Sequence, residues 1–293
     1  MNILLTGATG YIGSNLLNEL VLNEQNNIIC TYRNNYPELK FNNLKWIKYD
    51  GNISSLFKIT CKIDIIIHLA TFFSSKNDYN IIDEMISSNI TFGVHILEFA
   101  IKNNIKFFVN TSSYAQSVDN MNYNPQNFYT STKQAFEDIL KFYTASKMVK
   151  CINISLSDVY GINDNRPKFI NLLINSIINK EEKFNMSPGH QNIRYLYVDD
   201  AVRAFISAID LLFSNKINES ETYSVYGAED LTLLELVNIA LEISGVNMIA
   251  NAGYYPYRPR EIIYNKPRFE KLPNWSPNIN INEGIIKLLN ENK

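Results

Sequence analysis

Short apolar runs alternate with amphipathic stretches through the first half of the chain. The runs typical of buried β-strands are NILLT, NIICTYR, KWIKYD, DIIIHLA, KFFVNTS and VKCINISL. Between them, apolar residues at helical spacing occur in SNLLNELVLN, EMISSNITFGVHILEFAIKN and KQAFEDILKFYTASK. Strands that alternate with helices indicate βαβ units, so the pattern predicts an α/β fold with a doubly wound parallel sheet covered on both faces.

The pattern changes after about residue 160. Helical stretches there, FINLLINSIINK and LTLLELVNIALEIS, are separated by shorter strand candidates. Prolines crowd one aromatic-rich segment between residues 256 and 277, which excludes a continuous helix there. We expect residues 1–160 to form the sheet domain and residues 161–293 to form mainly a smaller substrate-binding lobe, with segments that return to the sheet. Because ligands of open α/β sheets bind at the carboxyl ends of the strands, the site is expected where the two parts meet.

A glycine-rich turn follows the first predicted strand directly. In GATGYIG, the residues Gly7, Gly10 and Gly13 lie where a strand passes into a helix. The absence of β-carbons allows a tight turn and close approach of a pyrophosphate, while free N–H groups at the helix start favour its negative charge. The first 160 residues are therefore predicted to be a dinucleotide-binding Rossmann domain. The expected cofactor contacts in this turn are Gly7, Thr9, Gly10, Tyr11, Ile12 and Gly13.

The ends of the second and third predicted strands bear on the identity of the cofactor. An acidic residue at the end of the second strand would bind the ribose hydroxyls of NAD, but CTYRNN has no acid there and supplies Arg33. This favours NADP(H), although an ordinary surface arginine would leave the same pattern. Asp50, which Gly51 follows, either accepts a hydrogen bond from the adenine amino group or caps the next turn.

Taken in chain order, these motifs resemble the extended short-chain dehydrogenase/reductase superfamily of NAD(P)-dependent nucleotide-sugar epimerases, dehydratases and 4-ketoreductases. The matching pieces are GATGYIG, HLA at 68–70, VNTSS ahead of YTSTK, DVYG at 158–161, RYLYVDDA at 194–201, RPRE at 258–261 and WSP at 275–277. The resemblance covers nearly the full chain, and it is specific to the superfamily rather than to one reaction. It implies that Leu69 and Ala70 also contact the cofactor.

The resemblance gives Tyr129 and Lys133 the roles of catalytic acid/base and its electrostatic activator, with Ser113 polarising the substrate oxygen and Thr111 behind it. An ordinary solvated helix face would also carry a Tyr and a Lys four residues apart. A free tyrosine has a pKa of about 10, and an ammonium about 4 Å away contributes about 4 kcal/mol in favour of phenolate at an effective dielectric of about 20. We therefore expect Lys133 to bring the pKa of Tyr129 towards neutrality, where acid/base catalysis is efficient.

Departures from the superfamily pattern reduce the number of reactions that the sequence supports. Sugar 4,6-dehydratases place Asp and Glu after the catalytic hydroxyl residue, whereas here Thr111 is followed by Ser112, Ser113 and Tyr114. Two chemistries remain: a 4-epimerase with tightly held NAD, or net reduction of a 4-keto sugar by NADPH. Because Arg33 favours NADPH, we predict reduction of the C4 keto group of a nucleotide-diphosphate 4-keto-6-deoxy sugar.

The substrate diphosphate requires local cations. The resemblance assigns this role to Arg194 and Arg258, since guanidinium groups bind phosphate in a bidentate manner, but a surface salt bridge is a competing explanation for each. Lys168 is an additional candidate contact. Asp158 stands where many relatives carry an amide, and Ser155 where many carry Arg, so both alter the pocket.

Composition limits the remaining partners. The formal net charge of −2 and the pI of about 6.0 give no global field that would recruit nucleic acid or an anionic membrane. Three scattered cysteines, Cys30, Cys61 and Cys151, are expected to be buried thiols in a reducing cytoplasm. The N-terminus shows no signal sequence, no apolar run approaches about 18 residues, and no histidine spacing indicates a metal site.

Relatives often form homodimers through two helices, which here carry apolar stripes that include Met85, Ile86, Phe136 and Leu140. Packing within the monomer would also explain these stripes. Two other functions fit the sequence less well. A non-catalytic module that senses NADP would typically lose Tyr129 and Lys133, which are both present. A reductase of small carbonyl compounds without a nucleotide would not need Arg194 and Arg258.

Overall fold

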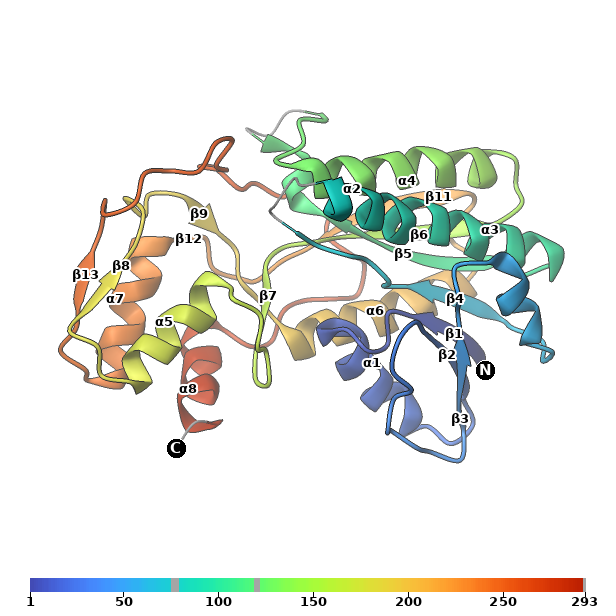
Figure 1. Cartoon of the computed structure of the whole chain (residues 1–293), viewed down its shortest axis with the longest axis horizontal. Helices are drawn as coiled ribbons and strands as arrows, with labels where there is room; N and C mark the ends of the chain where they lie inside the picture. Colours follow the sequence, from blue (N-terminus) through green and yellow to red (C-terminus); the bar gives the residue numbers. More distant parts are fainter. Residues whose placement is uncertain (75–78, 119–121, 292–293) are drawn as a thin grey trace.

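A seven-stranded parallel sheet forms the centre of the protein, which we describe from a computed structural model for residues 1–74, 79–118 and 122–291. The strand order across the sheet is β11-β6-β5-β4-β1-β2-β3 (Figure 1). The strands are β1 (Asn2–Thr6), β2 (Asn27–Tyr32), β3 (Leu44–Lys48), β4 (Ile65–His68), β5 (Phe107–Ser113), β6 (Lys150–Leu156) and β11 (Ser220–Val225). The first six coincide with the six apolar runs, so the predicted doubly wound α/β fold is confirmed.

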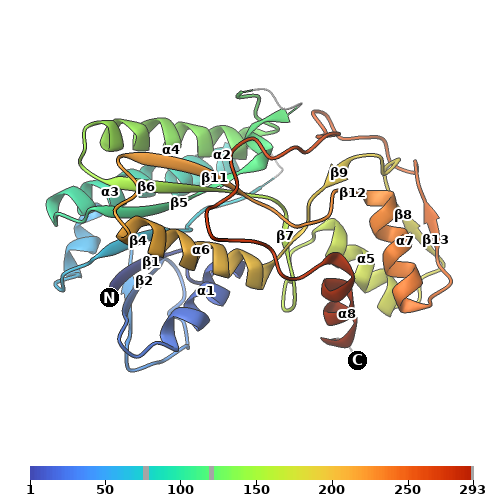
Figure 2. The ribbon, with the colours of Figure 1, turned by 180° about the vertical axis from the view of Figure 1, so that it is seen from behind.

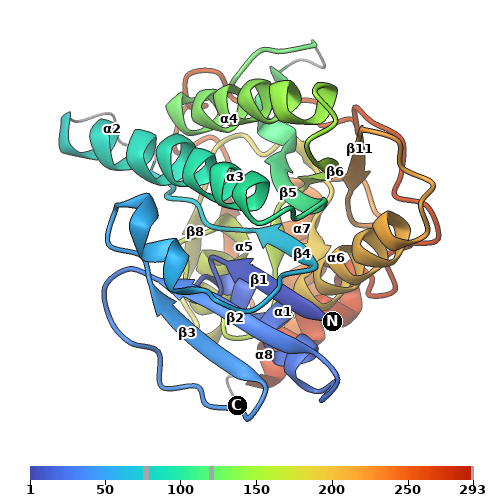
Figure 3. The ribbon, with the colours of Figure 1, turned by 90° about the vertical axis from the view of Figure 1, so that its right-hand side faces the viewer.

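Helices cover both faces of this sheet. On one face lie α1 (Tyr11–Val21) and α6 (Val198–Phe213), and on the other lie α3 (Phe92–Lys102) and α4 (Phe128–Ala145) (Figure 3). Successive side chains of a strand point to opposite faces. Accordingly, Ile3 and Leu5 are buried in the core against α1 and α6, while Leu4 is buried in the core against α3 and α4.

The long helical stretch predicted around residues 84–103 changes its hydrogen-bond spacing part-way along. It consists of α2 (Tyr79–Ile86), a π-helical turn (Ser87–Thr91) and α3. Asn89 in this turn accepts a hydrogen bond from the backbone N–H of Phe72 at 2.7 Å and donates to Thr132 Oγ1 of α4 at 2.9 Å. The π turn thereby ties the segment after β4 to the helix that follows β5.

A smaller lobe lies beyond one end of the sheet (Figures 1 and 2). Its elements are β7 (Val159–Tyr160), α5 (Phe169–Ile178), β8 (Lys183–Asn185), β9 (Asn192–Ile193), β10 (Leu196–Tyr197), β12 (Leu231–Thr232), α7 (Leu233–Ser244), β13 (Ile249–Asn251) and α8 (Ile281–Glu291). Residues 252–280 contain no helix, in agreement with the prediction from their prolines. The division at residue 160 stays a prediction; α6 and β11, which come later in the chain, pack with the sheet.

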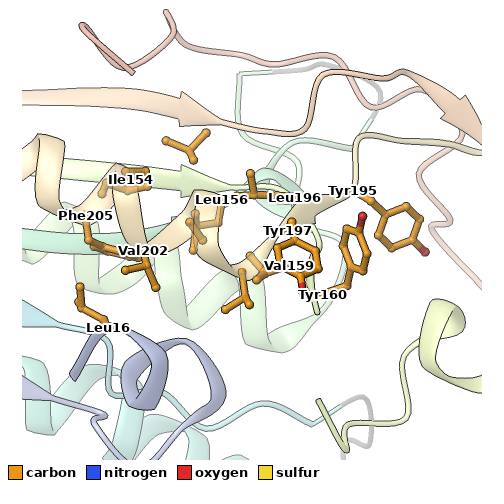
Figure 4. Packing of buried hydrophobic residues seen from close by; sticks show 14 of the residues in the cluster. Leu16, Ile154, Leu156, Val159, Tyr160, Tyr195, Leu196, Tyr197, Val202 and Phe205 are labelled. Atoms are coloured by element: carbon orange, nitrogen blue, oxygen red, sulfur yellow. The ribbon is translucent and has the colours of Figure 1, made fainter. Parts of the chain in front are cut away.

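A continuous apolar core joins the sheet to the lobe. Leu16 of α1 and Phe205 of α6 belong to the same buried cluster as Tyr160, Tyr195 and Tyr197 (Figure 4). The ring of Tyr160 meets the other two tyrosine rings edge to face, with centroids 5.7 Å and 5.4 Å away. Such aromatic contacts bury large apolar surfaces, so they hold the lobe against the strand ends.

The cysteines differ in their surroundings. Cys30 and Cys151 are buried in strands, as predicted, but Cys61 is exposed. The expectation for Cys61 was wrong because it lies in the loop that leads into β4, outside the apolar run itself. No helix in the part of the chain that the structure describes is both long and apolar enough to cross a membrane.

Candidate active site

The glycine turn between β1 and α1 has a geometry that only small residues allow. Gly7 has a φ of +74°, and a β-carbon there would lie 2.5 Å from the backbone nitrogen of Ala70. A β-carbon on Gly13 would lie 2.1 Å from the carbonyl oxygen of Gly7. Helix α1 starts after Gly10 without a side-chain cap or an acidic residue in its first turn, so its N–H groups remain open to an anion.

The other predicted cofactor contacts of the first half surround this turn. Thr9 and Gly10 are exposed, and Tyr11 and Ile12 are partly buried at the start of α1. Leu69 and Ala70 follow β4 directly and are partly buried. The Tyr11 hydroxyl donates to the carbonyl of Ile162 at 3.0 Å, which links the turn to the segment after β7.

Arg33 and Asp50 follow the neighbouring strands β2 and β3. The Arg33 side chain is 44% exposed, and its Nη2 lies 3.7 Å from Oε1 of Glu84, a separation and exposure typical of a weak surface ion pair. Asp50 Oδ1 accepts a hydrogen bond from the backbone N–H of Asn52 at 3.0 Å, and this bond lowers the pKa of Asp50. The turn-capping alternative for Asp50 is therefore present, and Gly51 beside it has a φ of +95° with open space around it.

The hydroxyl residues at the end of β5 point to alternate faces of the sheet. Ser113 Oγ accepts a hydrogen bond from the backbone N–H of Ala115 at 3.3 Å, and Thr111 Oγ1 donates to the carbonyl of His68 at 3.3 Å. Ser112 lies on the opposite face and donates to Oε1 of Gln116 at 2.9 Å. Because its lone pair receives the Ala115 N–H, the hydroxyl of Ser113 keeps its own proton free to donate.

Tyr129 and Lys133 lie one turn apart at the start of α4, as the sequence predicted. A reciprocal capping box between Asn127 and Thr130, with distances of 3.0 Å and 3.1 Å, fixes where the helix begins. Lys133 is only 5% exposed, whereas Tyr129 is partly exposed. The ring of Phe73 meets the ring of Tyr129 edge to face at 5.0 Å between centroids.

The electrostatics of this pair differ from the expectation. Burial raises the pKa of Tyr129, and a hydrogen bond with Thr71 and the charge of Arg166 only partly oppose this. Burial lowers the pKa of Lys133 to about 8, while the nearby carboxylate of Glu137 raises it. The expectation that Lys133 brings the pKa of Tyr129 towards neutrality was wrong, because the loss of hydration around the phenol outweighs the groups that favour the phenolate, which are Thr71 and Arg166.

Asp158 joins a partly buried polar cluster after β6. It accepts hydrogen bonds from the Tyr114 hydroxyl at 2.7 Å and from Lys168 Nζ at 3.1 Å. Burial disfavours its charged form, but the charge of Lys168 and the Tyr114 hydrogen bond outweigh this and hold the pKa of Asp158 below its usual value. Asp158 and Lys168, predicted separately as substrate contacts, are thus brought together.

The two predicted phosphate ligands have different environments. Arg194 Nη2 pairs with Asp230 Oδ2 at 3.1 Å, and its Nε is buried without a hydrogen-bond partner among the described residues. Arg258 lies exposed in the loop after β13, where its backbone N–H donates to Glu261 Oε2 at 3.3 Å. Both roles remain predictions, and the competing salt bridge is present for Arg194.

Sequence reasoning missed several residues of this region. A cavity with about 30 Å³ of space for water-sized molecules lies beside Ser113 and Arg194 and is also lined by Tyr114, Gln116, Glu137 and Asn265. Asn265 is 7% exposed, and its Nδ2 has no partner among the described residues. Only Glu137 left a signal in the sequence, since it stands four residues after Lys133 on the same helix.

Known proteins support the same fold. A CDP-abequose synthase of Yersinia pseudotuberculosis is 28% identical over 286 residues, which span 92% of this chain and 97% of the relative. A CDP-abequose synthase of Salmonella typhimurium is 27% identical over 300 residues, or 98% and 97% of the two chains. The crystal structure of UDP-glucuronic acid 4-epimerase from Bacillus cereus with UDP-glucuronic acid and NAD matches with a TM-score of 0.84 at 21% identity, over 100% of this chain and 99% of the other.

The sequence model of the NAD dependent epimerase/dehydratase family matches residues 3–225 of this chain. This match runs from the first strand through the last strand of the sheet, and includes the glycine turn, Ser113, Tyr129 and Lys133. The chain therefore belongs to the NAD dependent epimerase/dehydratase family and is an NAD(P)-dependent enzyme of the short-chain dehydrogenase/reductase type.

Proposed function

We propose that the protein reduces the C4 keto group of a nucleotide-diphosphate 4-keto-6-deoxy sugar with NADPH. The observation that carries this proposal is the placement of Tyr129 and Lys133 on successive turns of α4, which packs on the strand that ends at Ser113. The two relatives named CDP-abequose synthase are proteins whose name specifies a CDP-linked sugar. We therefore place CDP-linked substrates first among the candidates.

The chain's own residues fit a pyridine dinucleotide. The uncapped start of α1 suits a pyrophosphate, and no β-carbon of Gly7 or Gly13 obstructs the turn. At the end of β2, the loose pair between Arg33 and Glu84 leaves the guanidinium available for a 2′-phosphate, which supports NADPH over NADH. When bound, the nicotinamide supplies the hydride that reaches C4.

The raised pKa of Tyr129 suits a proton donor. At neutral pH the phenol keeps its proton, so it can protonate the alkoxide oxygen that forms as C4 receives the hydride. Lys133, with a pKa of about 8, is mostly an ammonium at pH 7 and stabilises the phenolate left behind. Ser113 donates its free hydroxyl proton to the same substrate oxygen, since its Oγ accepts from Ala115.

Charged residues near the lobe are proposed to bind the diphosphate and the sugar hydroxyls of the substrate. The Nε of Arg194 has no hydrogen-bond partner within the described part of the chain, which suits a diphosphate oxygen. Lys168 neutralises Asp158, so a substrate anion would not meet an unpaired carboxylate there. We assign Asp158 to a sugar hydroxyl, because a carboxylate accepts hydrogen bonds and does not attract phosphate.

The proposal is tested with purified protein, NADPH and a panel of CDP-, dTDP-, UDP- and GDP-4-keto-6-deoxy sugars, following the absorbance of NADPH. We expect oxidation with at least one member. Tyr129→Phe should lower the rate by about 10²- to 10⁴-fold while NADPH binding, followed by fluorescence, is retained. If no member is reduced and the protein instead epimerises an ordinary nucleotide sugar, the 4-epimerase alternative holds. Turnover that survives Tyr129→Phe would remove the role of this residue.

A homodimer is also proposed, although the stripes predicted to form it have another use. Met85, Phe136 and Leu140 are buried within the monomer, with exposures of 1% or less. Exposed large apolar residues on these helices include Tyr79 at 77%, Ile86 at 39% and Phe142 at 61%. Light scattering after gel filtration should show twice the monomer mass, and Phe142→Asp should reduce it to that of one chain; a monomer from the start would exclude the dimer.

A further inference from the structure

Gln116 lies in a short 3₁₀ turn directly after β5 and is 3% exposed. Its side-chain amide makes four hydrogen bonds. Oε1 accepts from Ser112 Oγ at 2.9 Å and from the backbone N–H of Ser113 at 3.0 Å. Nε2 donates to Gln134 Oε1 at 3.0 Å and to Glu137 Oε1 at 3.2 Å. The capacity of the amide, two donated and two accepted bonds, is therefore fully used.

The orientation of this amide follows from its neighbours. The backbone N–H of Ser113 can only donate, so the oxygen of the Gln116 amide must face it. Glu137 offers carboxylate oxygens, which accept, so the NH₂ group must face α4. A reversed amide would place its NH₂ group against the backbone N–H of Ser113, donor against donor. It would also place its oxygen against the carboxylate of Glu137, acceptor against acceptor.

These bonds connect the two elements that carry the candidate catalytic groups. One end of Gln116 holds the last residues of β5, where the Ser113 hydroxyl lies. The other end holds Gln134, the neighbour of Lys133, and Glu137, one turn further along α4. The 3₁₀ turn ends at Gln116 and α4 begins at Phe128. The side chain of Gln116 therefore links β5 to α4 more directly than the backbone does, and it sets the separation of these two elements.

We propose that Gln116 is a positioning residue that fixes the Ser113 hydroxyl relative to Tyr129 and Lys133. This inference rests on the proposed function, because it assumes that these three groups act on one substrate oxygen. Productive geometry at such a site is sensitive to small displacements: a shift of about 1 Å costs about 10²-fold in rate. A hydrogen-bonded bridge between strand and helix prevents that shift.

Three variants separate positioning from general stability. Gln116→Met keeps the length of the side chain and removes all four hydrogen bonds. Gln116→Glu keeps the acceptor towards Ser112 and Ser113 but faces Glu137 with a second carboxylate. The double variant Gln116→Glu/Glu137→Gln restores a donor to that contact, since the introduced amide at position 137 donates to the introduced carboxylate at position 116.

We expect Gln116→Met to lower kcat by about 10- to 100-fold, with less than about a threefold change in KM or in the Kd of NADPH. Gln116→Glu should lose more, and the double variant should recover about tenfold of kcat relative to it. The proposal is overturned if Gln116→Met keeps kcat within about twofold, if kcat and NADPH affinity fall together with thermal stability, or if the double variant recovers nothing.

Amide hydrogen exchange gives a readout that does not need turnover. In Gln116→Met, the Ser113 amide should exchange faster, because its acceptor is gone, while the amides of residues 107–110 should keep their protection. Unchanged exchange at Ser113 would overturn the positioning role even in an active enzyme. If the wild-type protein reduces no sugar of the panel but the Ser113 amide responds as expected, the proposed substrate is wrong and the bridge between β5 and α4 stands.

Discussion

The close approach of the glycine turn to β4 gives a quantitative prediction for Gly7→Ala. Two separate penalties act at this position. The φ of +74° lies in the left-handed region, which costs an alanine about 1–2 kcal/mol. In addition, the new β-carbon would lie 2.5 Å from the Ala70 nitrogen, so the backbone must move, and overpacking of this kind costs about 1–3 kcal/mol.

The chain offers a control that isolates the second penalty. Gly253 has a φ of +82°, close to that of Gly7, but nothing lies within 4 Å of the position of its β-carbon. Gly253→Ala should therefore cost only the backbone term, about 1–2 kcal/mol of unfolding free energy. Gly7→Ala should cost about 2–5 kcal/mol, because it pays for both the strain and the contact.

Urea denaturation followed by circular dichroism measures both variants against the wild-type protein, and fluorescence titration measures NADPH binding. Gly7→Ala should also weaken NADPH binding, since a displaced turn no longer presents the N–H groups at the start of α1. Gly253→Ala should bind NADPH normally. Equal stability losses in the two variants would refute the argument, because they would show that contact with Ala70 contributes nothing.

Three further predictions address the site and the lobe. Because burial lowers the pKa of Lys133 to about 8, kcat/KM for reduction should fall as the pH rises through about 8 and the ammonium is lost; a flat profile between about pH 6 and pH 10 would contradict this. Arg33→Ala should weaken NADPH binding by about 10- to 100-fold and NADH binding little, while Glu84→Gln should tighten NADPH binding; equal effects on both cofactors would count against the assignment. Asp200 is fully buried and accepts hydrogen bonds from the backbone N–H groups of Asn278 and Ile279. Asp200→Ala should therefore lower the free energy of unfolding, measured by urea denaturation, by about 3–5 kcal/mol. The control Asp199→Ala, at an exposed position, should lower it by less than about 0.5 kcal/mol.

Local patterns predicted the sheet well where strands are apolar throughout. The run DIIIHLA became β4, whose four residues are all buried. The last strand, β11, lies at the edge of the sheet and was missed because its sequence SETYSV begins with three polar residues. Its pairing with β6 joins residues about 70 positions apart. Periodicity reports which side of a strand is buried; it carries no information on such distant partners.

In the candidate site, too, the sequence predicted the features that depend on local structure and missed those that depend on distant segments. The spacing of Tyr129 and Lys133 was visible in the sequence, because a helix fixes which residues share a face. The direction of the Tyr129 pKa was not, since it depends on burial by segments such as the one that carries Thr71. Gln116 was equally hidden, because its four hydrogen bonds depend on the distance between β5 and α4.

The place of β11 in the sheet affects how the protein is made. Residues 220–225 pair with residues 151–156, all of β6 except its first residue, although α5, β8 and α6 lie between the two strands in the chain. Until a ribosome has released the chain past Val225, the backbone groups along that side of β6 have no strand to bond with, and an open strand edge recruits other unfinished chains. Synthesis of the first part of the lobe, from β7 to β10, therefore has to precede closure of the nucleotide-binding sheet, and shortened versions that stop before Ser220 are expected to aggregate during expression.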